Sequence, residues 1–256
     1  MSSFIACRIR RQPTDRLDAA LETSLARFPD AVRRYPAGGG LRGTRLAVNK
    51  ASRWPSSGVE LTVGFLDGAT TALRRRILEH MNEWSKCANV KFVESRTDPE
   101  VRITRFDSPP DMAGYWSYLG TEILGTPPDE PTMNLEGFTG RTAEEEFRRV
   151  VRHEAGHTLG FEHEHMRRQF VDRIDPEKAI RYFRETDGWT PAEVRAQVLT
   201  PLEQRSIRGT RRADEESIMC YQLPGEITRD ERPIVGGLDI SESDREFAGR
   251  IYPKRR

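Results

Sequence analysis

Four of the five histidines in this 256-residue chain lie within fourteen positions, in the segment RHEAGHTLGFEHEH (152–165). His153 and His157 are four residues apart, so on a helix their rings project from one face about one turn from each other. Both rings can then reach one cation at about 2 Å. Glu154 places a carboxylate where it can reach a water at the same ion. This spacing predicts a metal site with a general base beside it.

A third ligand is predicted at His163, six residues after His157. That spacing is too long for the same face of a straight helix. Gly160 lies between the two histidines and is expected to end the helix, which lets the chain turn back towards the ion. Three neutral imidazoles leave a tetrahedral Zn²⁺ with one open position, which is the arrangement of catalytic rather than structural sites. Water bound there would lose its proton near neutral pH to Glu154, and the zinc would polarise a carbonyl under attack.

The alternative is a surface helix that carries incidental histidines. It explains less, because the start of the helix and its glycine stop are inferred without reference to the histidines. Thr142 followed by Glu145 resembles a capping box. Phe147, Val150 and Val151 then follow a helical period up to Gly160.

The overall composition is that of a globular protein, with 36% hydrophobic and 32% charged residues. The 41 basic and 40 acidic residues give a net charge of +1, which argues against nucleic acid or an anionic membrane as a partner. Cys7, Cys87 and Cys220 are too few for a disulfide framework, and we expect reduced thiols, although one bridge stays possible. We expect a monomer.

The N-terminal residues MSSFIACRIRRQPTDRLD place a short apolar patch ahead of the arginines, the reverse of a secretory signal. No run approaches the eighteen or so apolar residues of a membrane span. Localisation stays open between the cytoplasm, export by another route and a sequence recorded without its leader.

Helical and strand patterns divide the chain near residue 45. Before this point Leu17, Leu21, Leu25 and Phe28 share one helical face, and the helix is expected to end at Pro29 before the glycine-rich YPAGGGLRG. We therefore predict an N-terminal extension, residues 1–47, and a catalytic domain, residues 48–256. In the latter, strands are predicted at 59–66, in NVKFVES and VRITRF, at 114–120 as an edge strand, and at 132–135, and a helix at 70–87. Later helices should begin after Asp175, Thr190 and Ser241.

The segment HEAGHTLGFEH matches the long zinc motif of the metzincin metallopeptidases. SIMCY (217–221) supplies the methionine turn that this clan also needs. A tyrosine two residues after the methionine, and Glu164 directly after the third histidine, resemble the astacin branch. RWPSSGVELTVGF, GYWSYLG, HEHMR and ISESDREFAGRIYP resemble astacin segments in the expected order, so the resemblance covers roughly residues 48 to 253.

The resemblance implies an α+β, metzincin-like fold: a twisted, mostly parallel sheet with an antiparallel edge strand, two long helices and an irregular C-terminal subdomain. The zinc cleft would lie between an upper part, to about residue 160, and a lower part, 161–256. The implied activity is that of a zinc-dependent endopeptidase, and the implied location is outside the cell.

The same resemblance implies roles for further residues. Met219 would be an apolar floor beneath the metal, and Tyr221 a distant fifth ligand that swings aside to hydrogen-bond the oxyanion. Glu164 would meet a new N-terminal ammonium once the extension is removed near residue 48. An edge strand would pair with extended substrate through Tyr115, Trp116, Ser117 and Tyr118. For Met219, Tyr221 and this strand, ordinary packing is the alternative interpretation.

Several features depart from the astacin pattern. Astacins usually hold two disulfides, for which this chain lacks the cysteines. Cys220 lies inside the methionine turn, where we expect its thiol to point away from the metal. His165 is expected to lie behind a ligand without binding the metal, or at the surface. The propeptide aspartate motif is not evident in residues 1–47. A thiolate at Cys7 could instead cover the zinc, as in matrixin precursors, but the residues around Cys7 do not match that pattern.

Two other classes of function compete with the endopeptidase: a non-catalytic zinc-bound peptide-binding module and a structural protein with an adventitious metal site. Glu154 favours the enzyme, because a module that only grips peptides has no need of a general base.

Overall fold

The computed structural model describes residues 7–28, 52–202 and 213–254. The predicted boundary between residues 47 and 48 lies outside them. The strands of the sheet are β1 (Arg8–Arg10), β2 (Val59–Phe65), β3 (Val90–Glu94), β4 (Val101–Thr104), β5 (Tyr115–Tyr118) and β6 (Met133–Leu135). The α-helices are α1 (Thr14–Arg27), α4 (Thr71–Met81), α5 (Glu144–Glu146), α6 (Arg152–Thr158), α7 (Arg168–Val171), α8 (Pro176–Thr186), α9 (Pro191–Val194) and α10 (Glu242–Ile251). Shorter helical segments are η1 (Asn82–Lys86), η2 (Gly120–Gly125), η3 (Phe147–Val151), η4 (Glu164–Met166), η5 (Arg195–Leu199) and η6 (Gly225–Ile227).

The sheet has the order β1-β5-β6-β4-β2-β3 and is parallel except for the β5–β6 pair. The strands predicted from residue 59 onwards are confirmed. The edge position predicted for the 114–120 strand is wrong, because β1 pairs outside β5, with Arg8 opposite Trp116 and Arg10 opposite Tyr118. A three-residue strand with Ile9 as its one apolar residue carries no alternating pattern from which it could be predicted.

Two helices pack together against the sheet: α4 and the helix over residues 144–158, which consists of α5, the π-helical η3 and α6. The Thr142 capping box is wrong, since the N-cap is Ala143 and Thr142 Oγ1 instead accepts a bond from the Thr139 N–H at 2.9 Å. The start predicted after Asp175 is confirmed, and the carboxylate accepts bonds from the Glu177 and Lys178 N–H groups. Thr190 and Ser241 also cap their helices, each in a capping box.

The N-terminal helix predicted before Pro29 is also present, as α1. It packs on η2 so closely that a Cβ at Gly125 would lie 2.4 Å from the Arg16 carbonyl oxygen. The extension and the sheet-containing part of the protein are therefore in direct contact.

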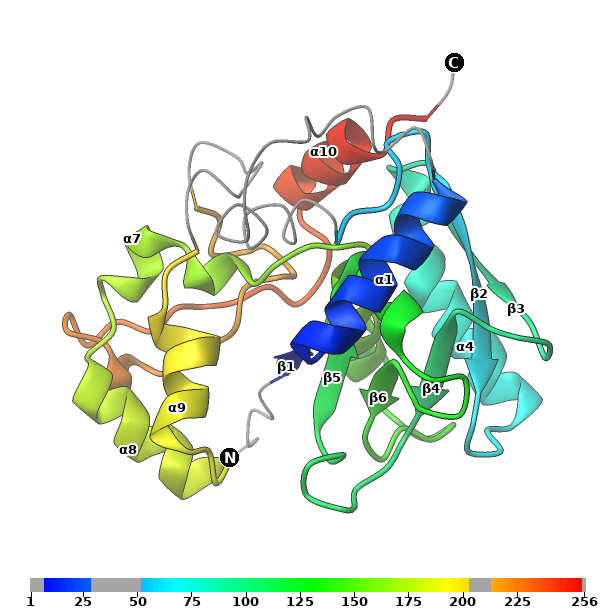
Figure 1. The fold of residues 1–256 in the computed structure, drawn as a ribbon. Helices are drawn as coiled ribbons and strands as arrows, with labels where there is room; N and C mark the ends of the chain where they lie inside the picture. Colours follow the sequence, from blue (N-terminus) through cyan, green and yellow to red (C-terminus); the bar gives the residue numbers. More distant parts are fainter. Residues whose placement is uncertain (1–6, 29–51, 203–212, 255–256) are drawn as a thin grey trace.

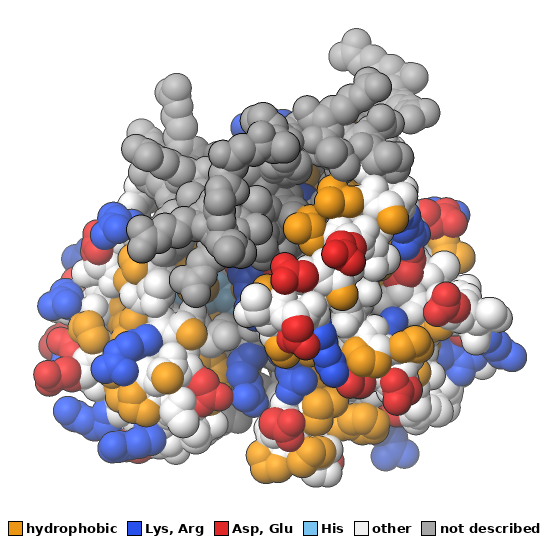
Figure 2. All heavy atoms as spheres, viewed as in Figure 1, with side chains coloured by type: hydrophobic (Ala, Val, Ile, Leu, Met, Phe, Trp, Pro, Cys, Tyr) orange, Lys and Arg blue, Asp and Glu red, His pale blue; other side chains and the backbone are white. Residues whose placement is uncertain are grey.

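Figure 1 shows the sheet on one side of the molecule, the helices α7, α8 and α9 on the other, and β1 between them. On the face drawn in Figure 2, acidic and basic side chains are interspersed, as the balanced composition predicts. Over the described ranges, no helix has the length and apolar character needed to cross a bilayer.

Candidate metal centre

The three predicted ligands converge at the end of α6. His153 and His157 project from the helix and His163 approaches from the chain beyond it, and all three side chains are buried. One ligand atom from each, together with Cys7 Sγ, forms a group whose members all lie within 4.8 Å of one another. The structure thus brings together the predicted set and adds a sulfur to it.

Backbone carbonyls orient two of these rings. His153 Nδ1 lies 2.6 Å from the Ile218 oxygen, and His157 Nδ1 lies 2.7 Å from the Phe161 oxygen. A carbonyl only accepts, so each Nδ1 carries the proton and each Nε2 keeps a lone pair for a metal. The two carbonyls therefore fix the tautomer and the orientation of each ring, as hydrogen-bond acceptors behind metal-binding histidines do.

The donor set fits a zinc ion. His153 Nε2 is buried without a hydrogen-bond partner among the described residues, and His157 Nε2 lies 2.9 Å from His163 Nε2. Two zinc–nitrogen bonds of 2.0–2.1 Å at a tetrahedral angle would separate the nitrogens by about 3.3 Å, which needs only a small adjustment. Burial lowers the pKa of His153 to about 4, so its ring is neutral as a ligand must be.

Gly160 makes the turn that the sequence predicts. Helix α6 ends at Thr158, and Gly160 has a φ of +89°, in the left-handed region that favours glycine. The Phe161 N–H then bonds back to the Gly156 oxygen at 3.0 Å. This reversal leads the chain back to His163.

Glu154 lies fully buried beside the cluster. Ser117 donates its hydroxyl to Glu154 Oε2 at 2.7 Å, whereas Oε1 has no hydrogen-bond partner among the described residues. Burial raises the pKa of Glu154 to about 7, against the smaller lowering effects of Cys7 and Ser117. A carboxyl group with this pKa can take and return a proton near neutral pH.

The methionine turn lies directly against α6. A Cβ on Gly156 would stand 2.5 Å from Met219 Sδ, so glycine is what allows this approach. Asp244 on α10 holds the turn, accepting bonds from Ser217 Oγ at 2.6 Å and from the Ile218 N–H at 2.8 Å. The carbonyl of Ile218 is the one that orients His153, so α10 contributes to positioning a ligand.

Tyr221 and His165 form an aromatic wall beside the cluster. The Tyr221 ring lies 4.3 Å from His163 and stacks on His165 at 4.2 Å, centroid to centroid. The Tyr221 hydroxyl is buried without a hydrogen-bond partner among the described residues. The surface alternative for His165 is wrong, because the ring is fully buried and its Nε2 lies 2.9 Å from the Gln197 oxygen.

The remaining predicted residues lie nearby with other partners. Glu164 Oε1 accepts bonds from Arg167 at 3.0 Å and from the Asp214 N–H at 3.2 Å, and burial raises the Glu164 pKa to about 7. Cys220 is buried outside the cluster, with its Sγ 3.7 Å from the Tyr221 oxygen, as expected for a thiol that points away from the metal.

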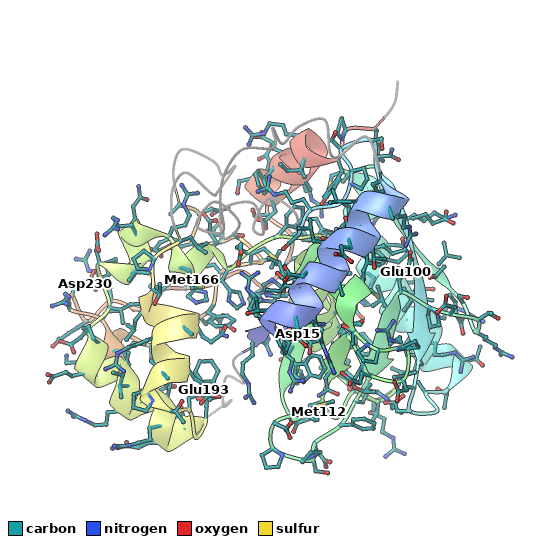
Figure 3. All side chains as sticks on the ribbon, in the orientation of Figure 1. Asp15, Glu100, Met112, Met166, Glu193 and Asp230 are labelled. Carbon is teal, nitrogen blue, oxygen red and sulfur yellow. The ribbon has the colours of Figure 1, made fainter. Side chains whose placement is uncertain are left out.

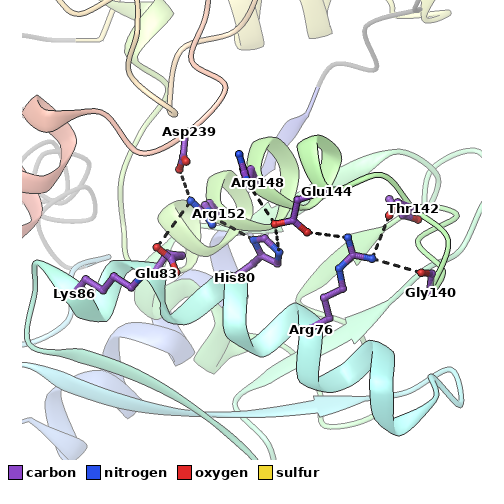
Figure 4. A network of polar contacts seen from close by, with 10 residues as sticks. All are labelled: Arg76, His80, Glu83, Lys86, Gly140, Thr142, Glu144, Arg148, Arg152 and Asp239. Atoms are coloured by element: carbon purple, nitrogen blue, oxygen red, sulfur yellow. Dashed lines mark hydrogen bonds and ion pairs between the residues drawn. The ribbon is translucent and has the colours of Figure 1, made fainter.

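Arg152, the residue before His153, connects α6 to its surroundings (Figure 4). Its Nε donates to His80 Nδ1 at 3.3 Å, and its Nη1 pairs with Asp239 and, at 3.9 Å, with Glu83. The Arg152 carbonyl accepts a bond from Trp84 at 2.8 Å. These contacts fix the helix turn that carries the first ligand.

The four residues predicted to bind substrate are those of β5. Their side chains are all buried, and the Ser117 side chain reaches Glu154. The backbone edge of β5 is paired with β1. Sequence reasoning missed the contact of Ser117 with Glu154 and the packing of Gly156 on Met219. The sequence analysis named Cys7 as a residue that could cover the zinc. The proximity of Cys7 to the histidine cluster depends on strand β1, which no sequence pattern predicted.

Comparisons with known proteins agree with this geometry. A model of the Astacin family of peptidases matches residues 47–181, more than half of the chain. Zinc metalloproteinase nas-27 of Caenorhabditis elegans is 30% identical over 122 residues, 44% of this chain and 25% of that protein. The dorsal-ventral patterning protein tolloid of Drosophila melanogaster is 28% identical over 123 residues, 48% of this chain and 10% of that protein. The chain thus spans a quarter or less of these curated relatives.

Solved structures extend the similarity. A structure of myroilysin has a TM-score of 0.74 and 30% sequence identity, and the match covers 81% of this chain and 98% of that one. High choriolytic enzyme 1, a hatching enzyme zinc-protease of Oryzias latipes, has a TM-score of 0.53 at 17% identity, covering 79% and 94%, and shows the shared fold.

The fold and the histidine cluster are those of the class of zinc metallopeptidases that the chain matches. Within this class, the chain belongs to the astacin family. The family match ends before Met219 and Tyr221, so the roles of these two residues depend on the geometry described above.

Proposed function

We propose that this protein hydrolyses peptide bonds in proteins or peptides with one zinc ion held by His153, His157 and His163. The observation that carries the proposal is the convergence of three neutral, buried imidazoles beside Glu154. When bound, zinc would acidify a water molecule and polarise the scissile carbonyl. Three protein ligands leave the fourth coordination position of a zinc ion open, and water or substrate would bind there.

Glu154 would act as the general base. Ser117 holds one carboxylate oxygen at 2.7 Å, which leaves Oε1 to take the proton of the attacking water. The protonated acid would then pass this proton to the leaving amine, so that no covalent intermediate with the protein is needed. The raised pKa of Glu154, about 7, suits both halves of this cycle.

Tyr221 would stabilise the oxyanion. Burial raises its pKa well above the usual value, so the phenol stays protonated and its hydroxyl can donate a hydrogen bond. Met219 would form the apolar floor, and the edge of β5 would pair with an extended substrate backbone once that edge is free. Gly160 and Glu164 would support the site through the turn and the Arg167 contact.

The test is Glu154→Gln, which keeps the size of the side chain and removes the base. We expect stoichiometric zinc by atomic absorption and a loss of casein hydrolysis of about 10²–10⁴-fold. Glu145→Gln, which alters an exposed carboxylate of the same helix, should cleave normally. Hydrolysis is measured in the full chain and again in a Cys7→Ser background, so that a blocked site cannot conceal activity. Normal cleavage by Glu154→Gln would contradict the assignment.

The non-catalytic peptide-binding module is the second candidate, and no observation favours it. It predicts bound zinc without hydrolysis in either background. Chelator-sensitive cleavage of denatured casein by the zinc-loaded protein would exclude it.

A further inference from the structure

His165 is fully buried beside the candidate metal centre, but its ring is not placed to bind the ion. Over the described ranges, the group of potential ligands around the three histidines does not include it. Both of its ring nitrogens already have partners: Nε2 lies 2.9 Å from the Gln197 oxygen, and Nδ1 lies 3.4 Å from the Tyr221 nitrogen. Any contribution of His165 to the site therefore acts through a neighbouring side chain.

The two hydrogen bonds fix the His165 ring in one orientation. The Gln197 carbonyl only accepts, so Nε2 carries the proton and donates it. Nδ1 then keeps a lone pair, which accepts the bond from the backbone N–H of Tyr221. A ring turned over by 180° would present carbon atoms to both partners, so these contacts select a single orientation.

The face of this fixed ring supports the ring of Tyr221. The two ring centroids are 4.2 Å apart, and the ring planes differ by 15°. Tyr221 lines the same cavity as Glu154, and its hydroxyl is buried without a hydrogen-bond partner among the described residues. Because no such bond fixes the hydroxyl end, the contacts of the ring set the direction in which the hydroxyl points.

His163 contacts both rings and offers a second route by which His165 could act. The centroid of the His163 ring lies 4.3 Å from that of Tyr221 and 4.8 Å from that of His165. The planes of His165 and His163 are tilted by 36°, whereas His165 and Tyr221 are nearly parallel. The stack and the Nδ1 bond both lead to Tyr221, and the experiment has to separate this route from the one through the ligand.

The backbone joins the two segments that carry these rings. The N–H of Glu164, the residue before His165, donates to the Met219 oxygen at 2.8 Å. Met219 lies two residues before Tyr221, so one backbone bond places η4 directly beside the methionine turn. The stack is therefore built into the way the two segments meet.

On its other side, η4 is attached to the helix formed by α9 and η5. The two short segments η4 and η5 pack together, and the Leu202 N–H, just beyond η5, donates to the Met166 oxygen at 2.9 Å. Figure 3 shows Met166 beyond the end of this helix opposite to Glu193. His165 thus stands between a helix of the C-terminal part and the ring of Tyr221.

We propose that His165 is the positioning residue for Tyr221, and that it holds the phenol in the direction from which the hydroxyl donates to the oxyanion. The inference rests on the oxyanion role of Tyr221 in the proposed function. A donor contributes most when it already points to the place where negative charge develops, because no reorganisation then accompanies the reaction. A stacked ring with both nitrogens bonded supplies this rigidity.

The first test reads the contact without hydrolysis. The tyrosine rings of the full-length protein are labelled with ¹³C, and the Tyr221 resonance is identified by its loss in Tyr221→Phe. A stacked ring shifts the resonances of its neighbour, so His165→Leu and His165→Gln should both move the Tyr221 resonance, in zinc-loaded and in zinc-free protein. Met166→Leu, a volume-conserving change of the next residue in η4, should leave it in place.

Two His165 variants are needed because leucine leaves the Gln197 carbonyl without its donor. Glutamine keeps an N–H donor and an acceptor, so His165→Gln gives a folded variant that lacks the ring even where His165→Leu does not fold. A Tyr221 resonance that His165→Gln leaves in place overturns the proposal.

The second test is a double-mutant cycle on hydrolysis of a quenched-fluorescent peptide, in the Cys7→Ser background. Tyr221→Phe should lower kcat about 10²–10³-fold, as loss of an oxyanion donor does, with KM little changed. His165→Leu should lower kcat about tenfold, which is part of that loss, and His165→Gln should lower it less. In Tyr221→Phe, neither His165 variant should lower kcat further, because the hydroxyl that they misplace is already absent.

The cycle separates the two routes. A loss of kcat that is as large in Tyr221→Phe as in its presence shows that His165 acts through His163, and overturns the proposal. A raised KM with an unchanged kcat overturns it too. Zinc content, measured by atomic absorption, should stay stoichiometric in every variant.

The two tests also separate failure of this inference from failure of the proposed function. A moved Tyr221 resonance without hydrolysis in any chain contradicts the peptidase, while it still supports the placement of the Tyr221 ring by His165. Hydrolysis with a Tyr221 resonance that does not respond to His165 supports the peptidase and removes the role of His165.

Discussion

A single hydroxyl holds the proposed general base in position. Glu154 is fully buried, and Ser117 donates its hydroxyl to Glu154 Oε2 at 2.7 Å. Among the described residues, the other carboxylate oxygen, Oε1, has no hydrogen-bond partner. Because a buried carboxylate relies heavily on each donor, Ser117 controls where Oε1 points. This makes Ser117 a positioning residue, although it lies on the strand expected to bind substrate.

Replacement of Ser117 by alanine should therefore lower kcat by about 10- to 100-fold, as the loss of a second-shell partner does, with KM little changed. Zinc content should stay stoichiometric, because Ser117 contacts no predicted ligand. Steady-state kinetics on a quenched-fluorescent peptide, in the Cys7→Ser background, separates the two constants. Ser85→Ala, which removes a hydroxyl bonded to Asn82, is the matched control. A raised KM with an unchanged kcat would instead place Ser117 in substrate binding.

The chemistry of the site is largely predictable at this scale. His153, His157 and His163 are close in sequence, with Glu154 and Gly160 among them. The helix and the turn at Gly160 therefore bring the three rings to one point. Ser117 and Cys7 are distant in sequence from the motif and reach it only through strands β5 and β1. Their positions follow from sheet pairing, which local patterns do not specify.

Between the elements, the helix that carries the first ligand is fixed by charged neighbours rather than by its own cap. Arg152 connects α6 to His80 of α4 and to Asp239 (Figure 4). The N-cap of the 144–158 helix makes no side-chain hydrogen bond, and Glu144 at its start pairs with Arg76 at 2.8 Å. Contacts between helices thus replace the capping box that the sequence suggested.

The His80 ring should make the free energy of unfolding depend on pH. Burial, together with Arg152 and Arg76, lowers its pKa, against the raising effect of Glu144. A lowered folded-state pKa means that the unfolded chain binds more protons at mildly acidic pH, so this contribution to stability is lost as pH falls through and below about 6.5.

The measurement compares urea unfolding of wild type and His80→Gln from pH 7.5 to 5.0. All other titrating groups are common to both proteins. The difference between their free energies of unfolding at each pH therefore reports on His80. We expect the stability of the variant to fall less steeply on acidification. An identical slope for the two proteins would contradict the assigned direction.

Element starts are the most predictable part of the fold. Asp175, Thr190 and Ser241 combine a capping side chain with a following apolar period, and each begins a helix at the expected residue. The strands from Val59 onwards are marked by alternating or continuous apolar residues. Strand β1 has neither signal, since its position depends on the free edge of β5 and not on its own composition.

For the whole molecule, the site lies where the sheet-containing part meets the C-terminal part, and residues from both contribute to it. His153 and His157 come from α6, whereas Met219 and Tyr221 come from the turn held by α10. An ion bound there would connect α6 to the chain beyond Gly160 that carries His163, so its binding energy adds to the stability of the folded chain.

Removal of zinc should therefore destabilise the protein as a whole. At a free zinc concentration of 1,000 Kd the ion contributes about 4 kcal/mol, which for a chain of this size corresponds to a Tm change of roughly 10 °C. Calorimetry before and after dialysis against a chelator should show this loss, with recovery on adding zinc and not magnesium. An unchanged Tm for verified metal-free protein would show that the two parts are held together without the ion.

The bonds that Asp244 accepts have a consequence for biosynthesis. Ile218 aims the first imidazole, Asp244 fixes Ile218, and Asp244 lies on α10, far downstream of the histidine motif. A polypeptide still emerging from the ribosome contains all three histidines before it contains this carboxylate. The final orientation of the first imidazole therefore waits until α10 has been synthesised.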